Sequence, residues 1–151
     1  MKITIETIPH EYQRYTTAGD WFFTKEPIYD YGDGGPSPST EKIGEEEVLH
    51  IKVSALGDWK REAILAIHEL VEVLACKSDG VTQEQVDKFD FAWTDNENEP
   101  GDSPDAPYNK QHRLAMGIEN IMAMALGVDW QAYEKQLEEL PEIPAKNEGN
   151  L

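Results

Sequence analysis

A histidine and a glutamate that can share one metal ion stand four residues apart in an apolar stretch of the chain. The segment runs His68-Glu69-Leu70-Val71-Glu72. In a helix, residues i and i+4 rise from the same face about one turn apart. The spacing therefore predicts that His68 and Glu72 bind one metal ion. Glu69 places a second carboxylate beside them.

A later segment offers the same residue types in a second helical pattern. His112, Met116 and Glu119 fall on one face, at spacings of four and three residues. Glu119 interrupts an otherwise apolar helix, where a carboxylate needs a cationic or metal partner. If the two helices pack together, His68, Glu72 and His112 form a set that suits Zn²⁺ with one position left for water. Glu119 is then a fourth ligand or the partner of a ligand.

The structural alternative for His68 and Glu72 is a salt-bridged pair on an ordinary helix. An apolar stripe flanks them and is expected to face the core, which places the pair at the edge of the buried surface; the stripe is Ile67, Leu70, Val71 and Leu74. Cys76 belongs to the core by the same pattern, and as the only cysteine it excludes an internal disulfide. His10 and His50 are expected to be exposed.

The helix at residues 68–72 resembles the active-site helix of the zincin metallohydrolases. His68 matches the first zinc ligand and Glu69 the general base, whereas Glu72 stands where that family has a second histidine. The resemblance implies a minimal zincin-like protein, in which a strand beside the helix helps to hold the substrate. It also implies a metal-dependent hydrolase with peptide bonds as the first substrate class.

The chain also resembles small uncharacterised proteins from bacteriophages and bacteria. The matching segments are Ala66–Glu72, Ala106–Tyr108, and His112 with Ile118 and Glu119. That resemblance covers most of the chain but leaves out residues 27–44, which are expected to form a surface loop insertion. It implies no activity.

A different carboxylate pattern favours another enzyme class. Glu69 and Glu72 form an ExxE motif, and Glu84 and Asp87 form an ExxD motif after a turn. On antiparallel helices, such motifs hold Mg²⁺ for nucleotide pyrophosphate hydrolysis. In these two motifs the chain resembles the all-α NTP pyrophosphatases of the dimeric dUTPase-like group.

The elements that position these residues change from strands to helices along the chain. Alternation predicts strands at 2–8, 12–17, 20–24 and 47–54, with Leu49, Ile51 and Val53 facing the core. Helical periodicity with capping residues predicts helices at 58–79, 82–91, 109–126 and 130–140.

We expect one α+β domain over residues 1–141, with a small antiparallel sheet of three or four strands packed by three or four helices. Residues 142–151 are expected to be a flexible tail. Residues 94–107 form a polar loop, from which Asp102 and Asp105 can reach a metal or a substrate.

Charge restricts the partners of this protein. The formal net charge is −17 over 151 residues, which disfavours binding to nucleic acids and to anionic membranes. It favours either a divalent cation site or, in a non-enzymatic alternative, binding to the basic surface of a host protein.

The N-terminus lacks the apolar block of a signal peptide, so we expect a cytoplasmic protein, in the host cytoplasm if it is phage-encoded. The oligomeric state does not follow from these patterns.

Overall fold

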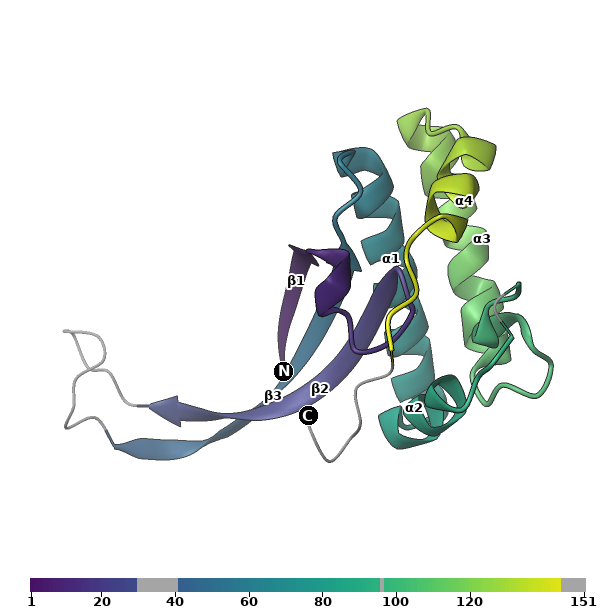
Figure 1. Ribbon diagram of the computed structural model, residues 1–151. Coiled ribbons are helices and arrows are strands. Elements are labelled where there is room, and N and C mark those ends of the chain that lie inside the picture. The colour runs from purple at the N-terminus through teal and green to yellow at the C-terminus, as the bar shows by residue number, and fades with distance from the viewer. Residues whose placement is uncertain (30–40, 96, 145–151) are drawn as a thin grey trace.

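The computed structural model describes residues 1–29, 41–95 and 97–144, which form an α+β fold as predicted. The strands are β1 (Lys2–Ile8), β2 (Gly19–Tyr29) and β3 (Lys42–Ser54). The helices are α1 (Trp59–Asp79), α2 (Gln83–Phe91), α3 (Asn109–Leu126) and α4 (Trp130–Glu138), with short 3-10 turns η1 (His10–Tyr12) and η2 (Pro100–Asp102). The helices gather on one side of the sheet (Figure 1).

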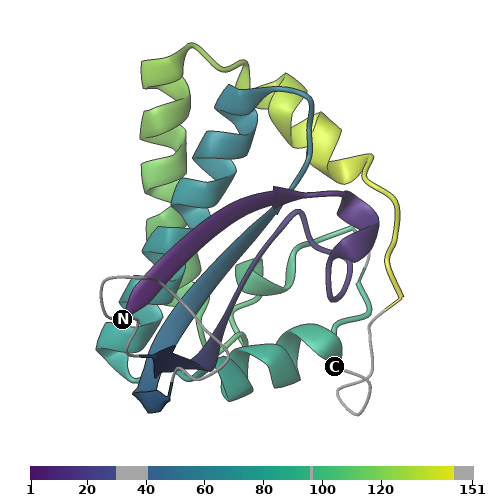
Figure 2. The ribbon, with the colours of Figure 1, turned by 90° about the vertical axis from the view of Figure 1, so that its left-hand side faces the viewer.

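The three strands form a mixed sheet in the order β1-β3-β2. β2 pairs with β3 in the antiparallel sense, but β1 pairs with β3 in the parallel sense. The prediction of a purely antiparallel sheet is therefore wrong at β1. β1 and β2 lie on opposite edges of β3, so the chain between them crosses the end of the sheet (Figure 2).

The crossing segment explains why residues 12–17 are not the predicted strand. The chain turns through η1, and the buried side chain of Gln13 then bonds to the sheet. Its Nε2 donates to the carbonyls of Ala18 and Lys52, at 3.1 and 3.2 Å, and contacts Ser54 Oγ at 3.2 Å. Tyrosine and threonine favour strands in general, but here one amide side chain holds the segment as a turn.

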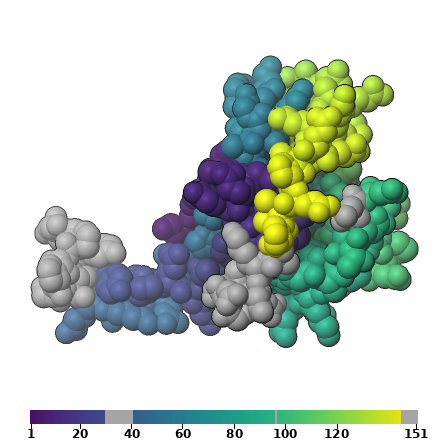
Figure 3. Space-filling model, in the orientation of Figure 1, coloured from purple at the N-terminus to yellow at the C-terminus, as the bar shows by residue number. Residues whose placement is uncertain are grey.

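β2 and β3 make a long hairpin that extends away from the helices (Figures 1 and 3). Because β2 continues to Tyr29 and β3 begins at Lys42, the predicted loop over residues 27–44 starts and ends inside strands. The middle of that loop, residues 30–40, lies outside the described residues. The hairpin also places Leu49, Ile51 and Val53 in the core, as predicted.

α1 begins and ends where the sequence predicts. The side chain of Asp58 accepts hydrogen bonds from the backbone amides of Lys60 and Arg61, and Gly80 closes the helix at a φ of 77°. α3 ends in the same way at Gly127. α4 ends at Glu138, two residues before the predicted end.

The buried face of α1 differs from the predicted one. The flanking apolar residues Ile67, Leu70 and Val71 are only partly buried, and Leu74 is 42% exposed. The polar side chains of His68, Glu69 and Glu72 are buried instead. Burial of polar groups is costly unless they have partners, so the partners on the neighbouring elements decide the orientation of this helix.

The C-terminal segment after α4 is attached to the N-terminal part of the chain. Ile143, in the predicted tail at 142–151, exchanges two hydrogen bonds with Thr16, at 2.7 and 3.0 Å. Residues 145–151 lie outside the described residues. None of the helices in the described part of the chain is long and apolar enough to cross a membrane.

Candidate metal centre

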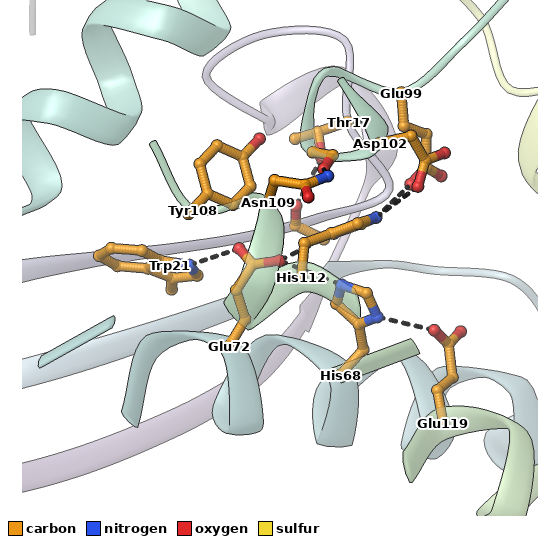
Figure 4. A network of polar contacts seen from close by, with 12 residues as sticks. Thr17, Trp21, His68, Glu72, Glu99, Asp102, Tyr108, Asn109, His112 and Glu119 are labelled. Carbon is orange, nitrogen blue, oxygen red and sulfur yellow. Dashed lines mark hydrogen bonds and ion pairs between the residues drawn. The ribbon is translucent and has the colours of Figure 1, made fainter. Parts of the chain in front are cut away.

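α1 and α3 lie side by side (Figures 1 and 2), and a group of buried polar side chains fills the space between them (Figure 4). α1 contributes His68 and Glu72, and α3 contributes His112 and Glu119. We call these four residues the inner cluster. All four are at most 5% exposed.

Three atoms of the inner cluster point toward a common centre. Glu72 Oε2 lies 3.2 Å from His68 Nε2 and 3.0 Å from His112 Nδ1. One ligand atom from each of these three residues lies within 4.8 Å of the other two. Tetrahedral Zn²⁺ with bonds of about 2.0–2.1 Å separates its ligand atoms by about 3.3 Å. The three residues that the spacing predicts as ligands therefore need only small shifts to hold such an ion.

Glu119 occupies the opposite edge of the His68 ring. Its Oε1 lies 2.7 Å from His68 Nδ1, while its Oε2 accepts a hydrogen bond of 2.6 Å from the hydroxyl of Tyr133 in α4. Of the two roles predicted for Glu119, this geometry favours the partner of a ligand over a fourth ligand. Tyr133 fixes the carboxylate, and the carboxylate fixes the imidazole. Such pairs are the usual support of metal-binding histidines.

The other two ligand side chains are held in a similar way. Trp21 Nε1 donates to Glu72 Oε1 at 2.9 Å, which leaves Oε2 directed at the centre. His112 Nε2 lies 3.0 Å from Asp102 Oδ1 in η2 and 3.6 Å from Glu99 Oε2. Figure 4 shows these partners on the outer side of each ligand.

The hydrogen bonds set the protonation of the two rings. Burial lowers the pKa of His68, but hydrogen bonds to Glu119 and Glu72 outweigh it and raise that pKa well above its usual value. Burial likewise lowers the pKa of His112, and the hydrogen bond and charge of Glu72 raise it. Burial raises the pKa of Glu72, but the hydrogen bonds from His112 and His68 prevail and lower it to about 2. Without a metal, these shifts favour protonated imidazoles around the carboxylate of Glu72.

Glu69 lies next to this centre and differs from it in its partners. It is buried, and its carboxyl group packs on Gly19 at the start of β2. A Cβ at position 19 would lie only 2.6 Å from Glu69 Oε1, so glycine is required there. Burial and the nearby charge of Glu72 raise the pKa of Glu69 well above its usual value. Among the described residues, no hydrogen bond to its carboxyl group is found.

Of the other residues that the sequence singles out, only Asp102 belongs to the site. Asp102 joins the site through His112, whereas Asp105 does not contact it. His10 and His50, expected to be exposed, are partly buried and bonded to other side chains away from the centre. Cys76 is buried, as predicted, and burial raises its pKa to about 12.

The carboxylates of the alternative Mg²⁺ motif are not brought together. Asp87 is bound to the guanidinium of Arg14, which also holds Asp20. Glu84 is exposed at the start of α2. Asp87 is thus already paired with a cation within the chain, and no group of possible metal ligands among the described residues combines it with Glu69.

Three supporting residues were missed by the sequence analysis: Trp21, Tyr133 and Glu99. Spacing gives no signal for them because each comes from an element distant in sequence from α1. Trp21 and Tyr133 are aromatic residues with a polar tip, which usually finds a partner when it is buried. That general preference is the only indication that their sequence offers.

Comparison with known proteins gives no match: no family model, no curated protein and no solved structure matches this chain.

Proposed function

We propose that the inner cluster binds one divalent metal ion, with Zn²⁺ as the first candidate, through His68 Nε2, Glu72 Oε2 and His112 Nδ1. One observation supports this most strongly. The three atoms converge, while the opposite atom of each side chain is held by Glu119, Trp21 or Asp102. This arrangement is typical of a metal site with its supporting partners.

The charge of the inner cluster supports the same proposal. Glu72 and Glu119 are buried with Glu69 beside them, and no Lys or Arg from the described residues pairs with these groups. Buried carboxylates need compensating positive charge. A dication provides it at the point where the ligand atoms meet.

Metal content provides the direct test. Protein purified without chelators and supplemented with zinc is expected to hold one ion per chain by elemental analysis. Glu72→Gln keeps the shape of the side chain but removes its charge, and is expected to abolish tight zinc binding, so that the purified variant holds no zinc. His50→Ala removes a histidine outside the site and is the control. A wild-type protein without bound zinc would overturn the proposal.

We further propose that the metal-bound protein is a hydrolase, with Glu69 as general base and peptide bonds as the first substrates to test. Three protein ligands leave one position of a zinc ion for water, and zinc lowers the pKa of bound water to about 7. Glu69 supplies a carboxyl group beside the ligands that no described residue occupies with a hydrogen bond. In this proposal Glu69 is the residue that would accept the proton from such a water.

Substitution of Glu69 separates binding from catalysis. Glu69→Gln is expected to keep the metal and the fold and to lower the rate of peptide hydrolysis by about 10²–10⁴-fold. Glu138→Gln, at the exposed end of α4, is the control for the loss of one charge. Equal rates for wild type and Glu69→Gln would eliminate the hydrolase and leave the metal site.

The burial of the ligands favours a second candidate function. A closed site that links α1 to α3 also suits a structural ion in a protein that acts by binding a basic surface of a host protein. The net charge of −17 supports such a partner. Capture of a host protein is then expected at 0.1 M salt and lost at 1 M, since the Debye length falls from about 10 to about 3 Å. Glu69→Gln leaves this capture unchanged if the binding function is correct.

A further inference from the structure

The described partners of the inner cluster differ in their exposure to solvent. Its partners Trp21 and Tyr133 are buried. In contrast, the side chains of Asp102 and Glu99 are 55% and 61% exposed. Both converge on His112, so the exposed end of the site lies at η2.

These two carboxylates form a second group of ligand atoms with His112. Asp102 Oδ1 and Glu99 Oε2 lie 3.0 and 3.6 Å from His112 Nε2. One ligand atom from each of the three residues lies within 4.8 Å of the others. We call Glu99, Asp102 and His112 Nε2 the outer group. It shares the imidazole of the inner cluster but uses its other nitrogen (Figure 4).

The turn that carries the outer group is fixed against the ring of His112. A Cβ at Gly101 would lie 2.6 Å from His112 Cγ and Nδ1, so the backbone lies directly on the imidazole. Asn109 Nδ2 donates to the carbonyl of Gly101 at 3.0 Å and holds the turn from α3. The backbone between the two carboxylates is thus held in place by packing against α3.

We propose that the outer group is the entry site of the divalent ion, which binds there from solvent before it reaches the inner cluster. This inference rests on the proposed metal site. Two exposed carboxylates raise the local concentration of cations. His112 Nε2 adds a buried nitrogen ligand that an ordinary acidic patch lacks.

The shared ring couples the two positions. A neutral imidazole has one nitrogen lone pair and one N–H group. While Nε2 of His112 holds the ion in the outer group, Nδ1 keeps its proton and donates to Glu72. When the ion moves inward to Nδ1, the Nδ1 proton passes to solvent water. Nε2, which the ion has left, takes one proton from solvent water and donates a hydrogen bond to Asp102. Only one of the two positions is therefore filled through His112 at a time.

The rate of zinc uptake tests this proposal. Stopped-flow mixing of metal-free protein with Zn²⁺ alone, followed by intrinsic tryptophan fluorescence, gives the association rate. Competition with a chelator of known affinity gives the equilibrium constant. Glu99→Gln is expected to slow association about tenfold and to change the final affinity less than threefold, because Glu99 makes no contact with the inner ligand atoms.

The controls remove the same charge from the same loop. Glu97→Gln and Asp105→Asn alter exposed acids outside the outer group, and are expected to keep the wild-type rate. If Glu99→Gln takes up zinc as fast as Glu97→Gln, the entry proposal is overturned although the inner site stands.

A second measurement detects the outer group by itself. Glu72→Gln lacks an inner ligand but keeps Glu99, Asp102 and His112. It is expected to bind Mn²⁺ weakly, measured by loss of the free-ion EPR signal, and the double variant Glu72→Gln/Glu99→Gln is expected to lose that binding. Equal Mn²⁺ binding by the two variants would overturn the outer group. Failure of the inner site has a different signature, which is wild-type protein that holds no tightly bound zinc.

Discussion

Two buried acidic clusters in this molecule balance their charge in different ways. In one, the guanidinium of Arg14 binds Asp20 and Asp87 with four contacts between 2.7 and 3.0 Å. We call it the arginine cluster. In the inner cluster, the cationic groups are the imidazoles of His68 and His112.

The difference lies in the permanence of the positive charge. An arginine keeps its proton at every pH at which the protein is folded, and the carboxylates around Arg14 raise its pKa further. The arginine cluster is thus complete within the chain. The imidazoles of the inner cluster are charged only while they hold extra protons, and a metal ion can replace those protons. The comparison separates a network that is complete within the chain from the network that we propose to bind a metal ion.

Loss of the arginine gives the largest expected effect. Arg14→Met leaves Asp20 and Asp87 without a cation in a largely buried place, and is expected to lower the free energy of unfolding by about 3–5 kcal/mol. Urea denaturation measures it. Added zinc should not change the loss, since Arg14 does not contact the inner cluster.

Arg61 offers the matched control on the surface. It contacts Gln136 and Asp58 at a more exposed position, so Arg61→Met is expected to cost less than about 1 kcal/mol. Similar losses for the two variants would contradict the structural role given to Arg14.

Zinc is expected to stabilise the protein through the inner cluster alone. At a free concentration one hundred times Kd, the free energy of unfolding should rise by about 2.7 kcal/mol. Glu72→Gln should lose this increment. Asp87→Asn lowers the starting stability but should keep the increment, because Asp87 belongs to the arginine cluster. A zinc increment that survives in Glu72→Gln would place the ion elsewhere.

Metal binding should release about two protons, since the ion replaces the N–H groups that His68 and His112 direct at Glu72. Calorimetry near pH 6 in buffers of different ionisation enthalpy measures this number. Release of no protons would mean that the ion is not bound by these nitrogens.

The same protons make the stability of the metal-free protein depend on pH. The pKa of both rings is raised by folding, so their contribution is complete below the unfolded value of about 6.5 and is lost as pH rises through the folded values. Metal-free protein should therefore lose stability above neutral pH. Zinc-bound protein should not.

Asp90 provides the most local test. It is buried and accepts hydrogen bonds from the hydroxyls of Tyr15 and Tyr108, and no Lys or Arg in the described part of the chain forms an ion pair with it. Burial raises its pKa to about 7. The folded state therefore binds the proton more tightly than the unfolded state, and stability should fall as pH rises from about 4 to about 7, by at most about 1.4 kcal/mol per pH unit.

The neutral variant Asp90→Asn should remove that dependence and be more stable than wild type above pH 7, by about 1–2 kcal/mol. Thermal unfolding at pH 5 and pH 8 compares the two proteins. An unchanged pH dependence in Asp90→Asn would assign the slope to other groups.

Local sequence was sufficient wherever neighbouring residues determine the structure. The ends of α1 follow from Asp58 and Gly80, because capping involves residues within one turn. The pairing of His68 with Glu72 follows from helix geometry alone. The hydrophobic pattern correctly predicted the burial of Leu49 and Ile51. It did not predict which face of α1 is buried, because the pattern treats polar side chains as if they had no partners in the interior.

The sequence by itself thus determined the helices, the strand β1, the C-terminal part of β3 and the residue types of the proposed metal site on two helices. Only the tertiary structure decided that β1 runs parallel to β3, that Glu119 supports His68, and that Asp102 and Glu99 meet at the outer nitrogen of His112. The physical reason is distance along the chain. Contacts within a helical turn are fixed by backbone geometry, whereas contacts between separate elements depend on how the whole chain packs.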